Sequence, residues 1–127
     1  MNMVRRYAAA DMAMHLEILD GPEDRTCVKL SGALDLAGVQ QVELRLTALV
    51  VGRRRNAVVD MSAVDGIASL GIGMLLSIGR AVAGNGCRLL LVAPQANVLE
   101  VLRRMRVDGV LSIVPDHASA EAELPRR

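Results

Sequence analysis

The apolar and polar positions of the first sixty residues predict two strands, a helix and a third strand. Residues 14–19 alternate apolar and polar side chains, which is typical of a half-buried strand. The turn-forming triplet Asp20-Gly21-Pro22 separates it from a second predicted strand over 25–31, so the pair should form an antiparallel hairpin. In Leu36–Val50 the apolar residues recur at helical spacing, and the apolar, β-branched run 57–60 indicates a buried strand.

The second half of the chain continues this alternation. After a predicted loop over 61–68, a helical pattern runs to Gly84-Asn85-Gly86, and Leu89–Val92 predicts the next strand. A third helix with its apolar face in 98–105, a last strand over 110–114 and a short helix over 118–124 complete the pattern. Strands that alternate with helices form parallel crossovers. The predicted fold class is therefore α/β, a mixed β-sheet of alternating βα units with an N-terminal antiparallel edge hairpin.

The apolar faces of these elements define an expected core. The helices should pack on the strands through Val39, Val42, Leu46, Leu75, Leu76 and Val82 on the helix side and Val58, Val59, Leu90 and Val92 on the strand side. Residues 1–13 have no clear period and are expected to be a flexible segment. A chain of 127 residues is near the usual size of one domain, which we place at 14–124.

Charge and composition exclude several kinds of partner. The 15 Lys plus Arg and 14 Asp plus Glu give a net charge of +1, too weak a field to attract nucleic acid or an anionic membrane. Tyr7 is the one aromatic residue, so the side chains that stack on nucleobases are missing. The longest uncharged run, 66–79, is shorter than the roughly 20 residues of a membrane-spanning helix. We expect a soluble cytoplasmic protein without nucleic acid or membrane insertion.

The sequence contains no recognisable catalytic or metal-binding constellation. Cys27 and Cys87 lie far apart in apolar runs, match no zinc-binding spacing with the two histidines, and are expected to be small buried hydrophobes. The glycine-rich run 66–73 lacks the Lys and Ser or Thr of a phosphate-binding loop. A phospho-acceptor receiver domain would need a lysine after its last strand, but the one lysine is Lys29. We therefore expect no enzyme activity, no cofactor and no metal.

Ser69 is the residue for which two roles stay open. It stands at the start of a predicted helix, where its hydroxyl would cap a backbone N–H and contribute about 1 kcal/mol. The same geometry suits a phosphoserine, because a phosphate there would meet free N–H groups and the positive end of the helix dipole. From the residues alone, the cap is the favoured role.

Two stretches of the chain resemble the signatures of one known family. The run VVDMSAVDGIASLGIGMLL over 58–76 resembles the hallmark of STAS domains, the sulphate transporter and anti-sigma factor antagonist family. Gly32-Ala33-Leu34-Asp35 resembles the family's other signature, a strand that ends in Gly-x-Leu-Asp before the first helix. The resemblance covers 14–124, keeps the family's order of elements, and implies a STAS-like mixed sheet.

The resemblance also implies where a partner binds. In the family's usual Asp-Ser-Ser-Gly-Leu segment the first serine is phosphorylated by a kinase that is also the anti-sigma factor, and this serine falls on Ser69. Ala68 stands in place of the aspartate and Leu70 in place of the second serine. The implied partner-binding residues are those of this segment together with an aspartate at the adjacent turn: Asp35, Asp65, Ile67, Ala68, Leu70, Gly71, Ile72 and Met74.

The implied function is that of an anti-sigma factor antagonist. Such a protein binds an anti-sigma factor of the histidine-kinase-like ATPase type, releases a sigma factor, and is switched off by phosphorylation, here at Ser69, with a serine phosphatase as a further partner. A phosphoserine adds about two negative charges to a largely apolar interface, which lowers affinity through desolvation and repulsion. The alternative is a STAS subunit of a lipid-transport ABC complex or of a stress-signalling scaffold, which would use the same surface without releasing a sigma factor.

Overall fold

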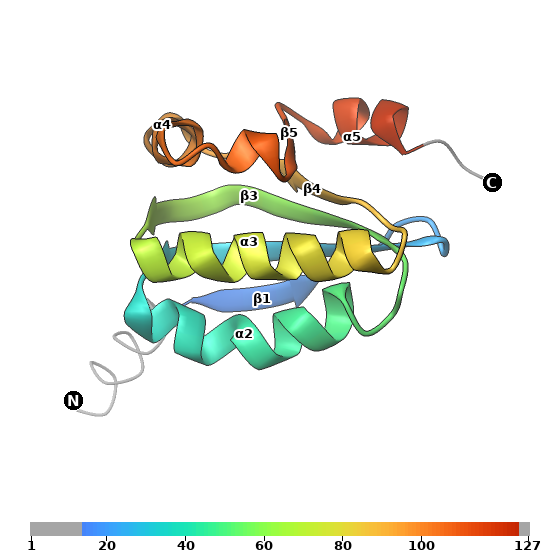
Figure 1. The fold of residues 1–127 in the computed structure, drawn as a ribbon, viewed down its shortest axis with the longest axis horizontal. Helices are drawn as coiled ribbons and strands as arrows, with labels where there is room; N and C mark the ends of the chain where they lie inside the picture. The colour runs from blue at the N-terminus through green and yellow to red at the C-terminus, as the bar shows by residue number, and fades with distance from the viewer. Residues whose placement is uncertain (1–13, 125–127) are drawn as a thin grey trace, which may run out of the picture.

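A five-stranded sheet in the order β1-β2-β3-β4-β5 forms the centre of the computed structural model, which describes residues 14–124 (Figure 1). β1 runs antiparallel to β2, and the other neighbouring strands are parallel. The elements are β1 (His15–Ile18), β2 (Arg25–Leu34), α2 (Leu36–Val50), β3 (Asn56–Ile67), α3 (Ser69–Gly84), β4 (Leu89–Val92), α4 (Ala96–Arg104), the 3-10 turn η1 (Val107–Gly109), β5 (Ser112–Val114) and α5 (His117–Glu123). The predicted α/β class and its N-terminal hairpin are confirmed. The flexible segment predicted over 1–13 lies outside the described residues.

The third strand is much longer than predicted. The sequence pattern indicated a strand over 57–60 and a loop over 61–68, but β3 continues to Ile67. This extension pairs with the second half of β2, and the last pair is Leu34 with Ile67. The register shifts twice along the pairing, once between Lys29 and Ser31 and once between Gly32 and Ala33. Met61 and Val64 are fully buried along this extension. The predicted loop was wrong because the partner strand, not the local composition, keeps this segment extended.

The last strand is shorter than predicted. β5 covers Ser112–Val114 instead of 110–114, because the Val110 and Leu111 N–H groups donate to the Val107 oxygen and continue the turn that begins with η1 (Val107–Gly109). This strand is one edge of the sheet, and β1 is the other.

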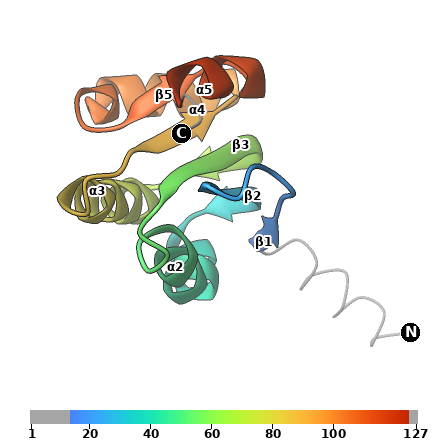
Figure 2. The same cartoon turned by 90° about the vertical axis from the view of Figure 1, so that its right-hand side faces the viewer.

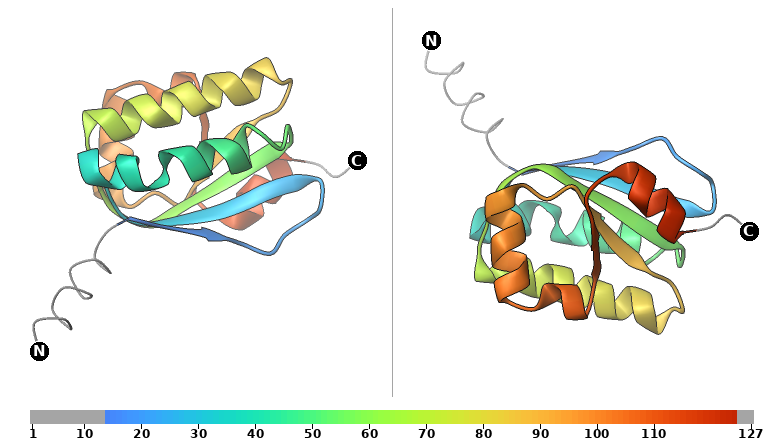
Figure 3. Two further views of the ribbon diagram at one scale, coloured as in Figure 1. Left: turned by 90° about the horizontal axis from the view of Figure 1, so that it is seen from below. Right: turned by 90° about the horizontal axis from the view of Figure 1, so that it is seen from above.

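Helices cover both faces of the sheet. Figure 3 shows α2 and α3 side by side over the strands in its left view and α5 across the strands in its right view. Val98 and Leu102 of α4 belong to the same hydrophobic cluster as α2 and α3, whereas Ala120 of α5 belongs to a separate one. Figure 2 shows α5 and α2 on opposite sides of the strands.

The expected core residues divide between these two clusters. Val59 packs in the larger cluster with the predicted helix residues, among them Val39, Leu46 and Leu75. Val58, Leu90 and Val92, which we had placed against the same helices, belong instead to the smaller cluster with Val114, Ala120 and Leu124. That placement was wrong because successive residues of a strand point to opposite faces of the sheet. The second face is covered by the C-terminal helix, whose docking the local pattern does not reveal.

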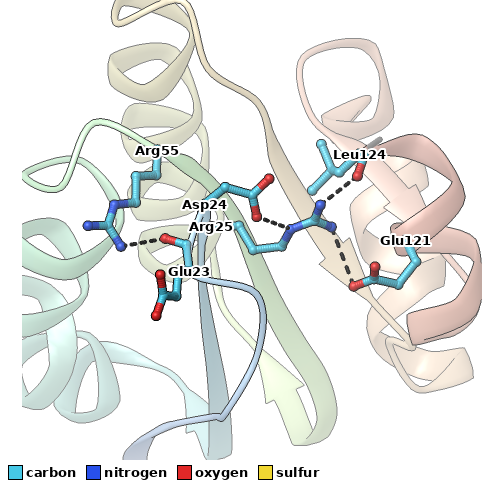
Figure 4. Close-up of polar contacts among 6 residues, drawn as sticks. All are labelled: Glu23, Asp24, Arg25, Arg55, Glu121 and Leu124. Carbon is cyan, nitrogen blue, oxygen red and sulfur yellow. Dashed lines mark hydrogen bonds and ion pairs between the residues drawn. The ribbon is translucent and has the colours of Figure 1, made fainter. Parts of the chain in front are cut away.

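A buried arginine holds α5 in place. The Arg25 side chain, at the start of β2, donates to the Leu124 backbone oxygen at 2.6 Å and to Glu121 Oε1 at 3.4 Å (Figure 4). It also contacts Asp24 Oδ1 at 3.4 Å. In the same region, Arg55 donates to the Glu23 backbone oxygen at 2.8 Å and fixes the turn before β2. A guanidinium buried without partners would be costly, so these contacts determine where the C-terminal helix sits.

Both cysteines are free thiols at the margin of the hydrophobic clusters, and both are half-buried instead of buried as predicted. Burial raises the pKa of the Cys27 thiol, which therefore stays protonated at neutral pH.

Truncation of either cluster should destabilise the protein. Leu75 and Leu90 are fully buried on opposite faces of the sheet. We expect Leu75→Ala and Leu90→Ala each to lower the free energy of unfolding by about 2–5 kcal/mol through lost burial and a residual cavity. Chemical denaturation measures the change. Leu44→Ala is the matched control, because Leu44 is 86% exposed and its loss should cost less than about 0.5 kcal/mol. Equal costs at Leu44 and at the two buried sites would contradict the described packing.

Candidate functional site

The starts of α2 and α3 lie side by side where the strands β2 and β3 end. β2 and β3 are parallel neighbours that remain paired to their last residues, Leu34 and Ile67. The Ala68 backbone N–H then donates to the Leu34 oxygen at 3.0 Å. Asp35 follows Leu34 directly and Ser69 follows Ala68, so the structure brings these two residues to the same surface. Figure 1 shows the starts of α2 and α3 on the same side of the molecule.

A glycine in the first turn of each helix allows this close arrangement. A Cβ at Gly71 would lie 2.5 Å from the Leu34 backbone oxygen, and one at Gly38 would lie 2.0 Å from that of Ala33. A larger residue at either position would push its helix away from the end of β2. Gly71, one of the predicted partner-binding residues, is buried and has this packing role.

The two helices begin with different caps. Asp35 is the N-cap of α2, and its Oδ1 accepts a hydrogen bond from the Gly38 N–H at 2.9 Å. The N-cap of α3 is Ala68, and no side chain caps this helix. The prediction that Ser69 caps α3 is therefore wrong. Because β3 reaches Ile67, Ala68 takes the extended cap conformation and Ser69 becomes the first helical residue.

The Ser69 side chain is exposed, and its hydroxyl makes no hydrogen bond within the described part of the chain. The first N–H groups of any α-helix lack partners inside the helix. No side chain caps α3, so the helix begins with uncapped N–H groups in the turn that carries the accessible Ser69 hydroxyl.

Burial separates the predicted partner-binding residues into two groups. Ile72 and Met74 are only 5% and 4% exposed and pack in the core. Leu70 is 48% exposed, and Leu36, beside the Asp35 cap, is 61% exposed. We use the name helix-start surface for the accessible set: Asp35, Leu36, Asp65, Ile67, Ala68, Ser69 and Leu70.

Leu36 was not among the residues selected from the sequence. Its signal was present, because Leu36 is an apolar residue of an amphipathic helix that lies away from the buried stripe of Val39, Val42 and Leu46.

The start of α4, with its N-cap Gln95, supports the strand that leads to Ser69. Gln95 Nε2 donates to the Ser62 backbone oxygen at 3.0 Å, and Asn97 Nδ2 donates to that of Asp65 at 3.0 Å. Asp65 is thereby held by its backbone while its carboxylate stays at the surface. Sequence reasoning did not find these amides, because their partners lie more than thirty positions away.

A second polar feature lies on the face of the sheet that α5 covers. Here Asp60 of β3 is only 7% exposed. Its Oδ1 accepts from the Ser62 N–H at 2.8 Å, and its Oδ2 lies 2.8 Å from His117 Nε2 of α5. Burial alone would raise the pKa of Asp60, but hydrogen bonds from Ser62 and His117 outweigh it and hold the pKa below its usual value. Asp60 is therefore ionised at neutral pH and links α5 to the sheet.

Within residues 14–124, no three His, Cys, Asp or Glu side chains gather in a way that could hold a metal ion. The same part of the chain has no helix with the length and apolar character needed to cross a membrane.

The family is settled by a match of the STAS domain model to residues 14–120, which include both helix starts. The chain belongs to the STAS domain family. The resemblance seen in the sequence is thereby confirmed, with Asp35 and Ser69 at the surface formed by the ends of β2 and β3. Among curated proteins, no sequence match is found.

Solved structures share the fold of this STAS domain. An anti-sigma factor antagonist from Mycobacterium paratuberculosis matches with a TM-score of 0.78 and 19% identity over 87% of this chain and 93% of that chain. A candidate anti-sigma factor antagonist from Thermotoga maritima matches with a TM-score of 0.77 and 18% identity over 89% of this chain and 95% of that chain. The phosphorylated form of the Bacillus cell fate determinant SpoIIAA matches with a TM-score of 0.64 and 13% identity over 87% of this chain and 100% of that chain. At these identities the likeness shows the fold alone.

The Asp60 contacts predict a pH-dependent stability. Asp60→Asn should lower the free energy of unfolding by about 1–3 kcal/mol at pH 7, because it removes the charge that the Ser62 N–H and His117 stabilise. A carboxyl with a lowered folded-state pKa stabilises the fold above its unfolded pKa, about 4, and this contribution is lost as the pH falls through the folded value. Denaturant titrations of both proteins from neutral pH into acid should show the difference shrinking.

The control for this prediction is Asp108→Asn, which changes an exposed aspartate that has no ion pair among residues 14–124. It should alter stability by less than about 0.5 kcal/mol throughout. A difference between wild type and Asp60→Asn that stays constant into acid would show that the Asp60 charge does not stabilise the fold.

Proposed function

We propose that this STAS domain is a cytoplasmic anti-sigma factor antagonist. It binds an anti-sigma factor of the histidine-kinase-like ATPase type through the helix-start surface and so releases a sigma factor for transcription. The observation that carries this proposal is the accessible Ser69 hydroxyl, on the residues that match the family's partner-binding segment and on a surface that also exposes Leu36 and Leu70. The shared fold with anti-sigma factor antagonists supports it.

Phosphorylation of Ser69 by the bound anti-sigma factor would end the interaction, and a serine phosphatase would restore it. A kinase can reach the exposed hydroxyl without unfolding α3. The uncapped N–H groups of the first turn and the positive end of the helix dipole favour the phosphate once it is present. The added charge then opposes docking of an apolar partner surface, and the nearby Asp35 carboxylate has the same sign.

Ala68 and Leu70 make the helix-start surface differ from the family's usual segment. Apolar side chains stand where the family usually has an aspartate and a second serine, so the area around Ser69 is less acidic and more apolar. We therefore expect the anti-sigma factor to present apolar side chains opposite the start of α3. A phosphate at Ser69 would be harder to accommodate in such an interface than in a polar one.

Two substitutions at Ser69 test the switch. Ser69→Ala should change stability by less than about 0.5 kcal/mol, since the hydroxyl makes no hydrogen bond, and should keep partner binding while preventing phosphorylation. Ser69→Asp should fold normally but bind at least about tenfold more weakly, or about 1.4 kcal/mol. Calorimetry measures both affinities against the anti-sigma factor captured from the native cell and identified by mass spectrometry. Thermal melts confirm folding.

The matched control is Ser77→Asp, which adds the same charge to an exposed serine two turns further along α3. It should leave affinity within twofold of wild type. Equal affinities for Ser69→Ala and Ser69→Asp, with no phosphate on Ser69 after incubation with the partner and ATP, would contradict the switch. Capture of a permease and its ATPase instead of an anti-sigma factor would contradict the function itself.

We also expect the purified protein to hydrolyse neither ATP nor GTP. A phosphate-binding loop needs several residues of flexible backbone between a strand and a helix. Here only Ala68 separates β3 from α3, and Gly71 is packed against Leu34. Phosphate release should equal the buffer background. A turnover that is abolished by Ser69→Ala would contradict this expectation.

A further inference from the structure

A cavity of about 350 Å³ lies between α4 and β5. Its walls are largely apolar, with Leu99 from α4 and Ile113 and Val114 from β5. Pro94 and Pro115, which follow the ends of β4 and β5, complete it. It lies at the carboxyl ends of two parallel strands, and its volume is in the range of small-molecule pockets. It shares no residue with the helix-start surface.

One cation lines this cavity. Arg103, in the last turn of α4, makes no ion pair or side-chain hydrogen bond among residues 14–124. Its neighbour Arg104 is paired with Glu100 at 2.7 Å and does not line the cavity. No carboxylate is among the lining residues, so the charge of Arg103 is uncompensated at an apolar opening.

The backbone around the cavity is held in place before any ligand binds. Ala93 has a φ of +56°, a left-handed conformation that residues with a Cβ seldom adopt. Its N–H donates to the Val114 oxygen at 2.9 Å, which ties the end of β4 to the end of β5. Backbone held in such conformations is concentrated at ligand and active sites. Pro94 directly after Ala93 further restricts this wall.

We propose that this cavity binds a small apolar carboxylate, such as a medium-chain aliphatic acid. The hydrocarbon chain would lie between Leu99 and Ile113 and lose its contact with water. The carboxylate would pair with Arg103, whose planar guanidinium matches two carboxylate oxygens. This site is independent of the proposed interaction with an anti-sigma factor, because neither site includes a residue of the other.

Octanoate is the probe for this site, and octanol is the probe that keeps the chain but lacks the charge. In amide chemical-shift titrations of the full-length protein, octanoate should produce saturable shifts centred on Leu99, Ile113 and Val114. Arg103→Gln should raise the dissociation constant for octanoate at least about tenfold, whereas Arg104→Gln should change it less than twofold. Octanol should shift the same residues with equal affinity in wild type and Arg103→Gln.

Both arginines are exposed, so these variants should fold, and unchanged dispersion of the amide spectrum confirms it. Three results would overturn the proposal. One is the lack of saturable shifts at the lining residues. Another is an equal loss of affinity in Arg103→Gln and Arg104→Gln, which would mean general attraction to the arginines of α4. The third is saturation centred on a different groove, the one between α2 and α3 that is lined by Leu44, Thr47 and Ser77.

Discussion

The pairing of β2 and β3 to their last residues is the constraint on which the functional surface depends. It brings the last residues of the two strands, Leu34 and Ile67, next to each other and positions the Ala68 N–H against the Leu34 oxygen. Both following helices then start beside these strand ends, and a glycine in the first turn of each lets it pack closely against the end of β2. Without this pairing, Asp35 and Ser69 would stand at the ends of two unrelated loops.

This arrangement separates the surface that would bind a partner from the core that stabilises the fold. Within a few residues of one another, Ser69 and Leu70 face solvent while Ile72 and Met74 are buried. A phosphate on the exposed hydroxyl would change the charge of the surface and leave the packing beneath it unaltered. The chemistry of a reversible switch is therefore compatible with a rigid domain, because the charge is added outside the core.

On the face of the sheet that α5 covers, buried charged side chains hold the C-terminal helix in position. Arg25 and Asp60 are buried charges, and each is satisfied by contacts with α5 or with the residues just after it. Buried ion pairs add little net stability but make misplacement costly, so they specify position more than they strengthen the fold. Arg103 is the contrasting case, since its exposed charge lies beside an apolar cavity without a described partner.

Sequence alone determined the features that local periodicity and composition control. The helix over Leu36–Val50 was predicted with its observed bounds, because its apolar stripe repeats every three or four residues. The order of strands and helices, and the motif residues from Asp35 to Gly71, were also readable from the chain. The tertiary structure decided the extension of β3 to Ile67, the cap at Ala68, and the face on which Leu90 is buried. These features depend on hydrogen bonds and packing between segments distant in sequence, and such contacts leave no periodic signal in either segment.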